Sequence, residues 1–290
     1  MTDVTLANPT EVSRPSALTV MRGALLLLSA TAPGVASRVA ADLFMKPRRY
    51  PTPPREQAIL QQGTPFTVRL GASREVRAWR FGEGPAVILA HGWEGRGSQL
   101  TPFVAPLLER GYSVVTFDAP GHGASPGSRS SLPHFAWAVR GVADAAGAPH
   151  AIIAHSLGCA AATLAMRDGL NVHRLVYIAP PLNPLDYTAR FGDILGLDAA
   201  TIEGLQMHIE ERFARKWSDY SLEESARLMN TPLLVVHDRD DRDTFWSEGA
   251  ALVQAWPGAR LMTTEGLGHR RILRDKGVIE DVTQFIDLLS

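Results

Sequence analysis

The chain has 290 residues, of which 45% are hydrophobic and 20% are charged, and such fractions exclude a wholly disordered, collagen-like or coiled-coil protein. The formal net charge of −1 argues against a nucleic-acid-binding protein held by a general basic field. The single cysteine, Cys159, cannot form an intramolecular disulfide, so nothing in the sequence points to an oxidising compartment and we expect a cytoplasmic protein.

The N-terminal segment contains an uncharged apolar stretch, residues 23–37, with four consecutive leucines. This stretch is shorter than the about 20 apolar residues that cross a bilayer, and Pro33-Gly34 interrupts it. A secretory signal begins with a short basic region, whereas Asp3 and Glu11 precede this stretch, although Ala30 to Ala32 has the small-residue pattern of a cleavage site. An exported protein therefore remains an alternative to a cytoplasmic one.

Apolar residues recur on one helical face along residues 35–44. We predict two short helices in this arm that pack on the protein body, and the alternative is a peripheral contact of the arm with a membrane. Lys46 to Pro54 is rich in proline and predicts a stiff linker. The chain is thus expected to consist of a helical arm with its linker, residues 1–54, and a main domain, residues 55–290.

Short strand patterns alternate with helical patterns through the main domain. Residues 66–70 and 76–81 predict an antiparallel hairpin, because a glycine-containing turn joins them. The later strand predictions are 86–90, 113–117, 151–155, 175–178, 232–237 and 260–264, and the helix predictions are 99–110, 132–146, 157–167, 245–256 and 278–289. Wholly apolar strands that alternate with helices indicate an α/β fold with a mainly parallel sheet covered by helices on both faces.

One interval, about residues 180–230, interrupts this alternation. It contains no clear strand, but Asp198 to Phe213 has a helical pattern, and Ser221 with Glu224 forms a capping-box pattern before another helix. An insertion after a strand, at the edge where such sheets carry their sites, predicts a small helical cap over a pocket.

The residues with evident chemistry begin at Ala154-His155-Ser156-Leu157-Gly158, between a predicted strand and a predicted helix. Small residues at positions 154 and 158 permit a tight strand-to-helix turn that raises the serine hydroxyl above the sheet edge. The motif alone is also compatible with a serine that only caps the helix N-terminus.

A nucleophilic serine requires a base and a group that orients the base, and the chain supplies both downstream. His269 follows the last predicted strand in Gly266-Leu267-Gly268-His269, and Asp241 lies in the loop after the strand at 232–237. The imidazole would remove the serine proton, and the carboxylate would fix the imidazole tautomer. Asp240, the neighbour of Asp241, is a second candidate for the acid.

These motifs resemble those of the α/β-hydrolase superfamily, over roughly residues 64–290. The matching segments are His91-Gly92-Trp93, Asp118 to Ser125, the turn at Ser156, the Asp241 loop and Gly268-His269. The resemblance implies the α/β-hydrolase fold with an eight-stranded sheet, and an oxyanion hole made by the backbone N–H groups of Trp93 and Leu157. In the family the acid commonly follows a glycine by three residues. Asp238 stands at that glycine position here, which favours Asp241 over Asp240.

Several nearby residues have both a structural and a functional interpretation. We expect His91, His122 and His155 to shape loops and Cys159 to be buried packing. Met207, Phe213 and Trp217 are candidates either for the cap core or for an acyl pocket. Arg270 and Arg271 are candidates either for ion pairs with Asp240 or Asp243 or for recognition of an acidic substrate.

The sequence as a whole predicts a serine hydrolase, of carboxylesterase type, that cleaves a carboxylic ester or related acyl bond through an acyl-enzyme on Ser156. A thioesterase, an aminopeptidase or an acyltransferase with the same residues remains an alternative, as does a ligand receptor without turnover. The expected partner is a small-molecule acyl substrate rather than nucleic acid. We expect no cofactor and no metal, because no phosphate loop, dinucleotide fingerprint or metal-ligand spacing occurs.

Overall fold

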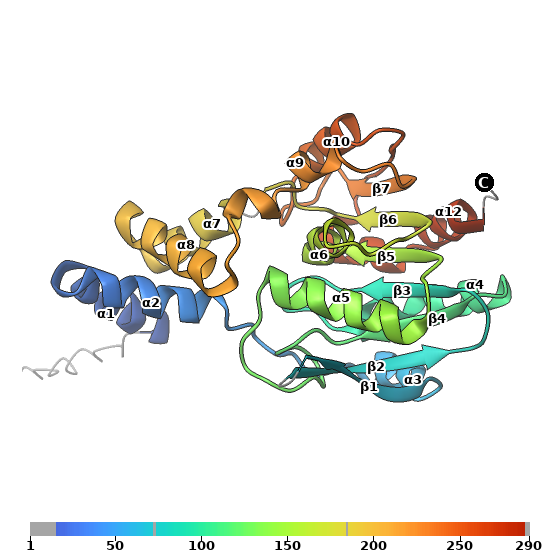
Figure 1. Ribbon diagram of the computed structural model, residues 1–290, viewed down its shortest axis with the longest axis horizontal. Coiled ribbons are helices and arrows are strands. Elements are labelled where there is room, and N and C mark those ends of the chain that lie inside the picture. Colours follow the sequence, from blue (N-terminus) through green and yellow to red (C-terminus); the bar gives the residue numbers. More distant parts are fainter. Residues whose placement is uncertain (1–15, 72–73, 184, 288–290) are drawn as a thin grey trace, which may run out of the picture.

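In a computed structural model of the protein, which describes residues 16–71, 74–183 and 185–287, an eight-stranded sheet occupies the centre of the main domain (Figure 1). Its strands are β1 (Thr64–Leu70), β2 (Arg74–Phe81), β3 (Ala86–Ala90), β4 (Ser113–Phe117), β5 (Ala151–His155), β6 (Arg174–Ile178), β7 (Leu233–Asp238) and β8 (Arg260–Thr264). Their order is β1-β2-β4-β3-β5-β6-β7-β8; β1–β2 and β2–β4 pair antiparallel, and all other neighbours pair parallel. The predicted mainly parallel eight-stranded sheet is confirmed.

Helices cover both faces of this sheet, which explains why its central strands are apolar throughout. One face packs against α5 (Leu132–Ala146), α6 (Leu157–Arg167) and α10 (Trp246–Ala255), and the other against η1 (Gly97–Phe103), α4 (Val104–Glu109) and α12 (Lys276–Asp287). Within β5, Ile152 and Ala154 belong to the first core, and Ala151 and Ile153 belong to the second. Alternate residues of a strand face opposite sides, so a strand buried on both sides needs an unbroken apolar run.

One predicted helix is divided in the structure. The pattern over residues 99–110 corresponds to η1 followed by α4, with Pro102 inside the 3₁₀ segment. Proline has no N–H and disfavours helical geometry in the residue before it, and therefore interrupts a regular α-helix. Two residues noted in the N-terminal segment, Asp3 and Glu11, lie outside the described residues. So do the last residues of the helix predicted over 278–289.

The remaining helices form a lobe beside one end of the sheet (Figure 1). They comprise the arm helices α1 (Ala17–Thr31) and α2 (Pro33–Phe44) and the cap helices α7 (Leu185–Leu195), α8 (Ala199–Phe213), η2 (Trp217–Tyr220) and α9 (Leu222–Ala226). The arm and the cap share a small core made of Ala40, Ala41, Met45, Leu205 and Ile209. The arm thus packs on the cap, and its link to the main domain leads into α3 (Pro54–Leu60).

Candidate active site

Ser156 lies on a strained turn between β5 and α6. Its φ of 54° and ψ of −125° are rarely adopted by residues other than glycine, at a cost of about 1–3 kcal/mol. A Cβ at Gly158 would lie 2.6 Å from the Ala90 carbonyl oxygen, and one at Gly92 would lie 2.8 Å from Ser156 Cβ, so close packing against the end of β3 requires glycine at both positions. The Ser156 side chain makes no helix-capping hydrogen bond, which argues against the interpretation of this serine as an N-cap.

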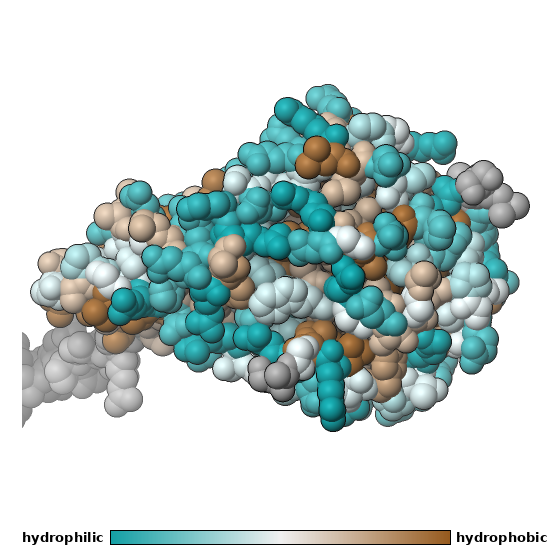
Figure 2. All heavy atoms as spheres, viewed as in Figure 1, coloured by the Kyte–Doolittle hydropathy of each residue, from teal (hydrophilic) through white to brown (hydrophobic). Residues whose placement is uncertain are grey.

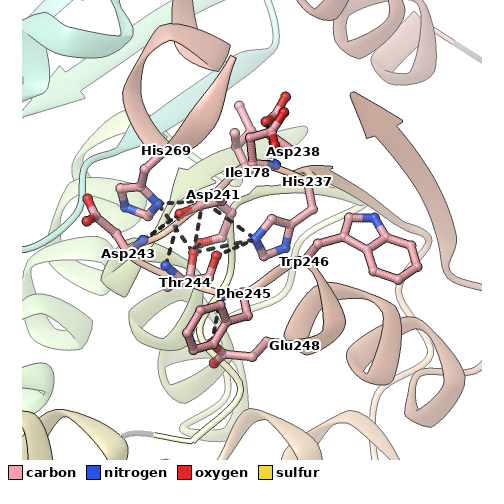
Figure 3. Close-up of polar contacts among 12 residues, drawn as sticks. Ile178, His237, Asp238, Asp241, Asp243, Thr244, Phe245, Trp246, Glu248 and His269 are labelled. Atoms are coloured by element: carbon pink, nitrogen blue, oxygen red, sulfur yellow. Dashed lines mark hydrogen bonds and ion pairs between the residues drawn. The ribbon is translucent and has the colours of Figure 1, made fainter. Parts of the chain in front are cut away.

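Asp241 and His269 are joined by a hydrogen bond (Figure 3). His269 Nδ1 lies 2.7 Å from Asp241 Oδ2, which also accepts the Thr244 hydroxyl at 3.1 Å. Oδ1 of Asp241 accepts the backbone N–H groups of Asp243 and Thr244 at 2.8 and 3.0 Å. Asp240 is exposed, and its Oδ2 instead accepts the Gly266 N–H at 2.8 Å. Of the two candidate acids, the structure therefore places Asp241 against His269.

The environment of Asp241 favours its ionised form. Burial acts to raise the pKa of this carboxyl, but the adjacent His237 ring, the hydrogen bond from His269, the charge of His269 and the Thr244 N–H together hold the pKa well below its usual range. Thr244 was not singled out from the sequence. The Asp-x-x-Thr spacing from 241 to 244 is a signal for it, because an aspartate commonly accepts the backbone N–H groups two and three residues further on.

A second histidine lies on the side of Asp241 opposite to His269 (Figure 3). His237, at the end of β7, is fully buried, with its Nε2 3.6 Å from Asp241 Oδ2 and 3.1 Å from the Thr244 carbonyl oxygen. Its Nδ1 has no hydrogen-bond partner among the residues that the structure describes, and it lies against Gly249, where a Cβ would clash. The acid is thus contacted by one imidazole on each side. Only the fold reveals this, because an apolar strand pattern does not indicate the role of its last histidine.

The turn at Ser156 and the His269 loop lie side by side. The His155 ring is centred 4.6 Å from the His269 ring, and its Nε2 donates to the His269 carbonyl oxygen at 2.9 Å. Burial and the neighbouring His269 lower the pKa of His155 to about 3, so this ring is neutral. No hydrogen bond among the described residues joins the Ser156 hydroxyl to His269. Such contacts are often long in ligand-free sites and shorten when a substrate binds.

The cap contributes a residue that the sequence did not reveal. Tyr187, on α7, lies beside the Ser156 side chain and close enough for the serine to affect its pKa. Burial and the charge of Glu248 raise the pKa of Tyr187, which keeps its hydroxyl neutral. The Arg190 guanidinium lies 5.8 Å from the Tyr187 ring and donates to the Asp243 carbonyl oxygen, so α7 is tied to the loop that carries Asp241.

The loop that contains Trp93 is fixed by two buried histidines. His91 Nε2 accepts the Ala119 N–H at 2.9 Å and its Nδ1 donates to the Gly92 carbonyl oxygen, while His122 Nε2 accepts the Glu94 N–H at 3.1 Å. Burial lowers the pKa of His122 to about 4 and that of His91 well below its usual value, so both rings are neutral.

The two N–H groups expected to form an oxyanion hole are those of Trp93 and Leu157. Neither group is used in a hydrogen bond within the part of the chain that the structure describes. Both therefore remain available to a ligand atom.

The other residues singled out from the sequence lie outside this group. Phe213 and Trp217 pack against the shared core of arm and cap, whereas Met207 is exposed. The Arg270 guanidinium lies 3.9 Å from the Asp243 carboxylate. A surface hollow of about 530 Å³ adjoins His269 and is lined by residues 240, 242, 243 and 266–271, without Ser156. Within the described ranges, no group of three or more His, Cys, Asp or Glu side chains is arranged to hold a metal ion.

Comparison with known proteins identifies the family of the chain. The sequence profile of the Alpha/beta hydrolase family matches residues 87–281, and the chain belongs to this family. Pimeloyl-[acyl-carrier protein] methyl ester esterase from Aeromonas salmonicida is 34% identical over 104 residues, which are 34% of this chain and 39% of that protein. The similarity thus spans well under half of the relative's length.

Solved structures of esterases share the fold. An esterase from Pyrococcus furiosus superimposes with a TM-score of 0.64 at 17% identity, over 83% of this chain and 98% of that chain. An esterase from Exiguobacterium antarcticum gives a TM-score of 0.61 at 16% identity, over 77% of this chain and 99% of that chain. At such low identity these similarities establish the architecture alone.

Proposed function

We propose that this hydrolase is a serine hydrolase of carboxylesterase type, which cleaves a carboxylic ester or related acyl bond of a small molecule through an acyl-enzyme on Ser156. The observation that carries the proposal is the 2.7 Å hydrogen bond between His269 and Asp241, beside the strained turn that presents Ser156. The partial relative is by its name a methyl ester esterase, which favours an ester over an amide.

In the proposed reaction, Ser156 Oγ forms a bond to the substrate carbonyl carbon while His269 Nε2 takes the hydroxyl proton. Asp241 holds the imidazole orientation and stabilises the imidazolium. The N–H groups of Trp93 and Leu157 donate to the carbonyl oxygen as it becomes negative, and such donors are typically worth about 3 kcal/mol each. The bond to the leaving group then breaks, and the leaving group departs with the proton from His269. A water that gives its proton to His269 releases the acid and restores the serine.

Two variants test the assignment of the nucleophile and the base. We expect Ser156→Ala and His269→Ala each to lower kcat by about 10⁴ to 10⁶, and the double variant to be little worse, because the two residues act as one unit. A fluorophosphonate probe should label the wild type and the matched control Ser218→Ala, an exposed serine of the cap, but not Ser156→Ala. Labelling that persists in Ser156→Ala would exclude Ser156 as the nucleophile.

A substrate panel separates the alternative activities. p-Nitrophenyl esters of graded chain length, an acyl thioester and an aminoacyl-nitroanilide should be tested on the same preparation. Ester turnover in excess of the other two supports the proposal. Turnover of the thioester or the nitroanilide alone would replace it with a thioesterase or an aminopeptidase. Absence of both turnover and labelling would favour a ligand receptor.

A further inference from the structure

The arm helices have an inner face that is covered and an outer face that is not. Leu25, Ala36 and Ala40 are buried on the inner side, where the arm meets the cap. The outer side carries large apolar side chains that are between 38% and 67% exposed, namely Leu18, Val20, Leu26, Leu27, Val35 and Val39. These are six of the fourteen large exposed hydrophobic side chains of the described residues, within 22 positions, so the exposure is concentrated at one place.

The six side chains, here called the outer arm face, belong to the end of the molecule where α1 and α2 project from the sheet (Figures 1 and 2). Ile194 and Met207 of the cap are also exposed, and Arg22 of α1 donates to the Ile194 carbonyl oxygen at 2.7 Å. The apolar surface therefore continues from the arm onto the cap. Exposed apolar surface of this kind marks a place where a protein meets a partner or a membrane.

Positive charge is concentrated in the arm and the linker that follows it. Residues 16–49 contain five basic side chains and one acidic side chain, whereas the whole chain has a net charge of −1. Arg49 is used internally, since its guanidinium donates to three loop carbonyl oxygens. The side chains of Arg38, Lys46 and Arg48, by contrast, have no hydrogen bond or ion pair to any residue that the structure describes. Arg38 lies on α2 between Val35 and Val39 of the outer arm face.

We propose that the outer arm face binds the surface of a bilayer that contains anionic phospholipid. Apolar side chains of an interfacial helix enter the boundary between headgroups and acyl chains, while neighbouring lysines and arginines contact the lipid phosphates. No helix in the described ranges is long and apolar enough to cross a membrane, so α1 and α2 would lie in the interface. A second copy of the chain fits this face less well, because it would bring together the Arg38 side chains of the two copies, which have no ion pair among the described residues.

The location of the face indicates a substrate class, and this step rests on the proposed function. The arm packs on α7 and α8, and α7 carries Tyr187 against Ser156. A bilayer bound to the arm would therefore lie beside the cap, which follows β6 and reaches the nucleophile. The geometry favours esters of long-chain acids or alcohols that partition into the bilayer, rather than small water-soluble esters.

Sedimentation of the full chain with vesicles tests the docking without any measurement of activity. Vesicles of phosphatidylcholine and phosphatidylglycerol in equal parts should bind the wild type much more strongly than vesicles of phosphatidylcholine alone. Leu26→Ser with Leu27→Ser should weaken binding roughly tenfold or more, since both side chains are exposed in the free protein and buried in the lipid. Arg38→Gln and Lys46→Gln should each weaken it about fivefold.

The matched control is Leu228→Ser, because Leu228 is equally apolar and more exposed but lies in neither the arm nor the apolar surface beside it. This control should bind vesicles like the wild type. Melting temperatures near that of the wild type would show that the variants fold. Equal binding by the wild type and the Leu26/Leu27 double variant, or no binding of the wild type to anionic vesicles, would overturn the proposal. So would a dimer of the wild type that the same double variant dissociates, because it would identify a second copy as the occupant.

The docking and the proposed function fail in different ways. A wild type that binds anionic vesicles but cleaves no ester leaves the docking intact and refutes the esterase. A wild type that cleaves esters in solution but ignores vesicles refutes the docking alone. Cleavage of a long-chain ester that rises on addition of anionic vesicles, beside unchanged cleavage of a short-chain ester, would support both.

Discussion

Replacement of Asp241 by asparagine would disturb His269 in a way that the structure specifies. Oδ1 of Asp241 accepts two backbone N–H groups, those of Asp243 and Thr244, so the single oxygen of an asparagine must stay at that position. A flipped amide would turn its NH₂ toward two buried donors. The amide nitrogen would then replace Oδ2, 2.7 Å from His269 Nδ1, and donate to it. His269 would carry its proton on Nε2, which could no longer accept the proton of Ser156.

We expect Asp241→Asn to lower kcat about 10⁴-fold, which corresponds to ~5 kcal/mol in the activation free energy. Asp240→Asn is the matched control. Among the described residues, the Asp240 carboxylate accepts a single hydrogen bond, from the Gly266 N–H of the loop after β8. An amide oxygen preserves that bond, so the rate should stay within about threefold of the wild type. Initial rates on a p-nitrophenyl ester, with circular dichroism as a check on folding, measure both. Equal losses, or the larger loss at Asp240, would refute the reasoning.

The wild type and Asp241→Asn should also differ in how the free energy of unfolding depends on pH. The pKa of Asp241 is lower in the folded chain than its value of about 3.9 in an unfolded one. The group therefore contributes stability above about pH 4, and this contribution is lost as the pH falls through the folded pKa. The difference in the free energy of unfolding between the wild type and Asp241→Asn should shrink as the pH is lowered below about 4. Urea titrations at a series of pH values measure it, and a constant difference would contradict the assignment.

Two further substitutions test the surroundings of the site. Gly92→Ala would place a Cβ 2.8 Å from Ser156 Cβ and should slow fluorophosphonate labelling by about tenfold or more. The control Gly34→Ala, whose added Cβ would have no neighbouring atom within 4 Å, should be labelled at the wild-type rate. Equal rates for the two variants would show that the turn at Ser156 adjusts to the added methyl group at little cost. Glu56→Ala removes the carboxylate that accepts from the buried Arg96 at 2.8 Å and should lower the free energy of unfolding by about 3–5 kcal/mol in urea titrations; a loss below about 1 kcal/mol would mean that water replaces the carboxylate.

The parts of the fold that were predictable from the sequence are those with a local cause. A parallel strand between two layers of helices must be apolar at every position, and this gave the central strands to within about a residue. Glycines that permit the turn at Ser156 are likewise visible as a short motif. The division of the 99–110 helix has a local cause too, in Pro102, although a continuous apolar periodicity concealed it.

The parts that were not predictable depend on residues far apart in the chain. Tyr187 lies beside Ser156 only because the cap packs on the main domain, and the spacing of 31 positions contains no signal for it. Glu56 joins Arg96 and Arg274, from segments that follow the first and the last motifs of the site. The contacts of such side chains depend on tertiary packing, so in a single sequence they cannot be distinguished from other charged or aromatic residues.

The three aspartates after β7 show how the fold separates residues that the sequence places together. Asp238 Oδ2 accepts the Thr264 hydroxyl at 2.7 Å and the Leu267 N–H at 3.0 Å, and Asp240 accepts the Gly266 N–H, so both fasten this loop to the loop after β8. Asp241, one residue further, turns inward to His269. Asp238, which stands at the glycine position of the family's motif, therefore links the loop that carries the acid to the loop that carries the histidine. Because Asp238 holds the two loops together without contact to His269, its replacement by glycine would preserve the pattern of the motif and lose the attachment that sets the distance between acid and base.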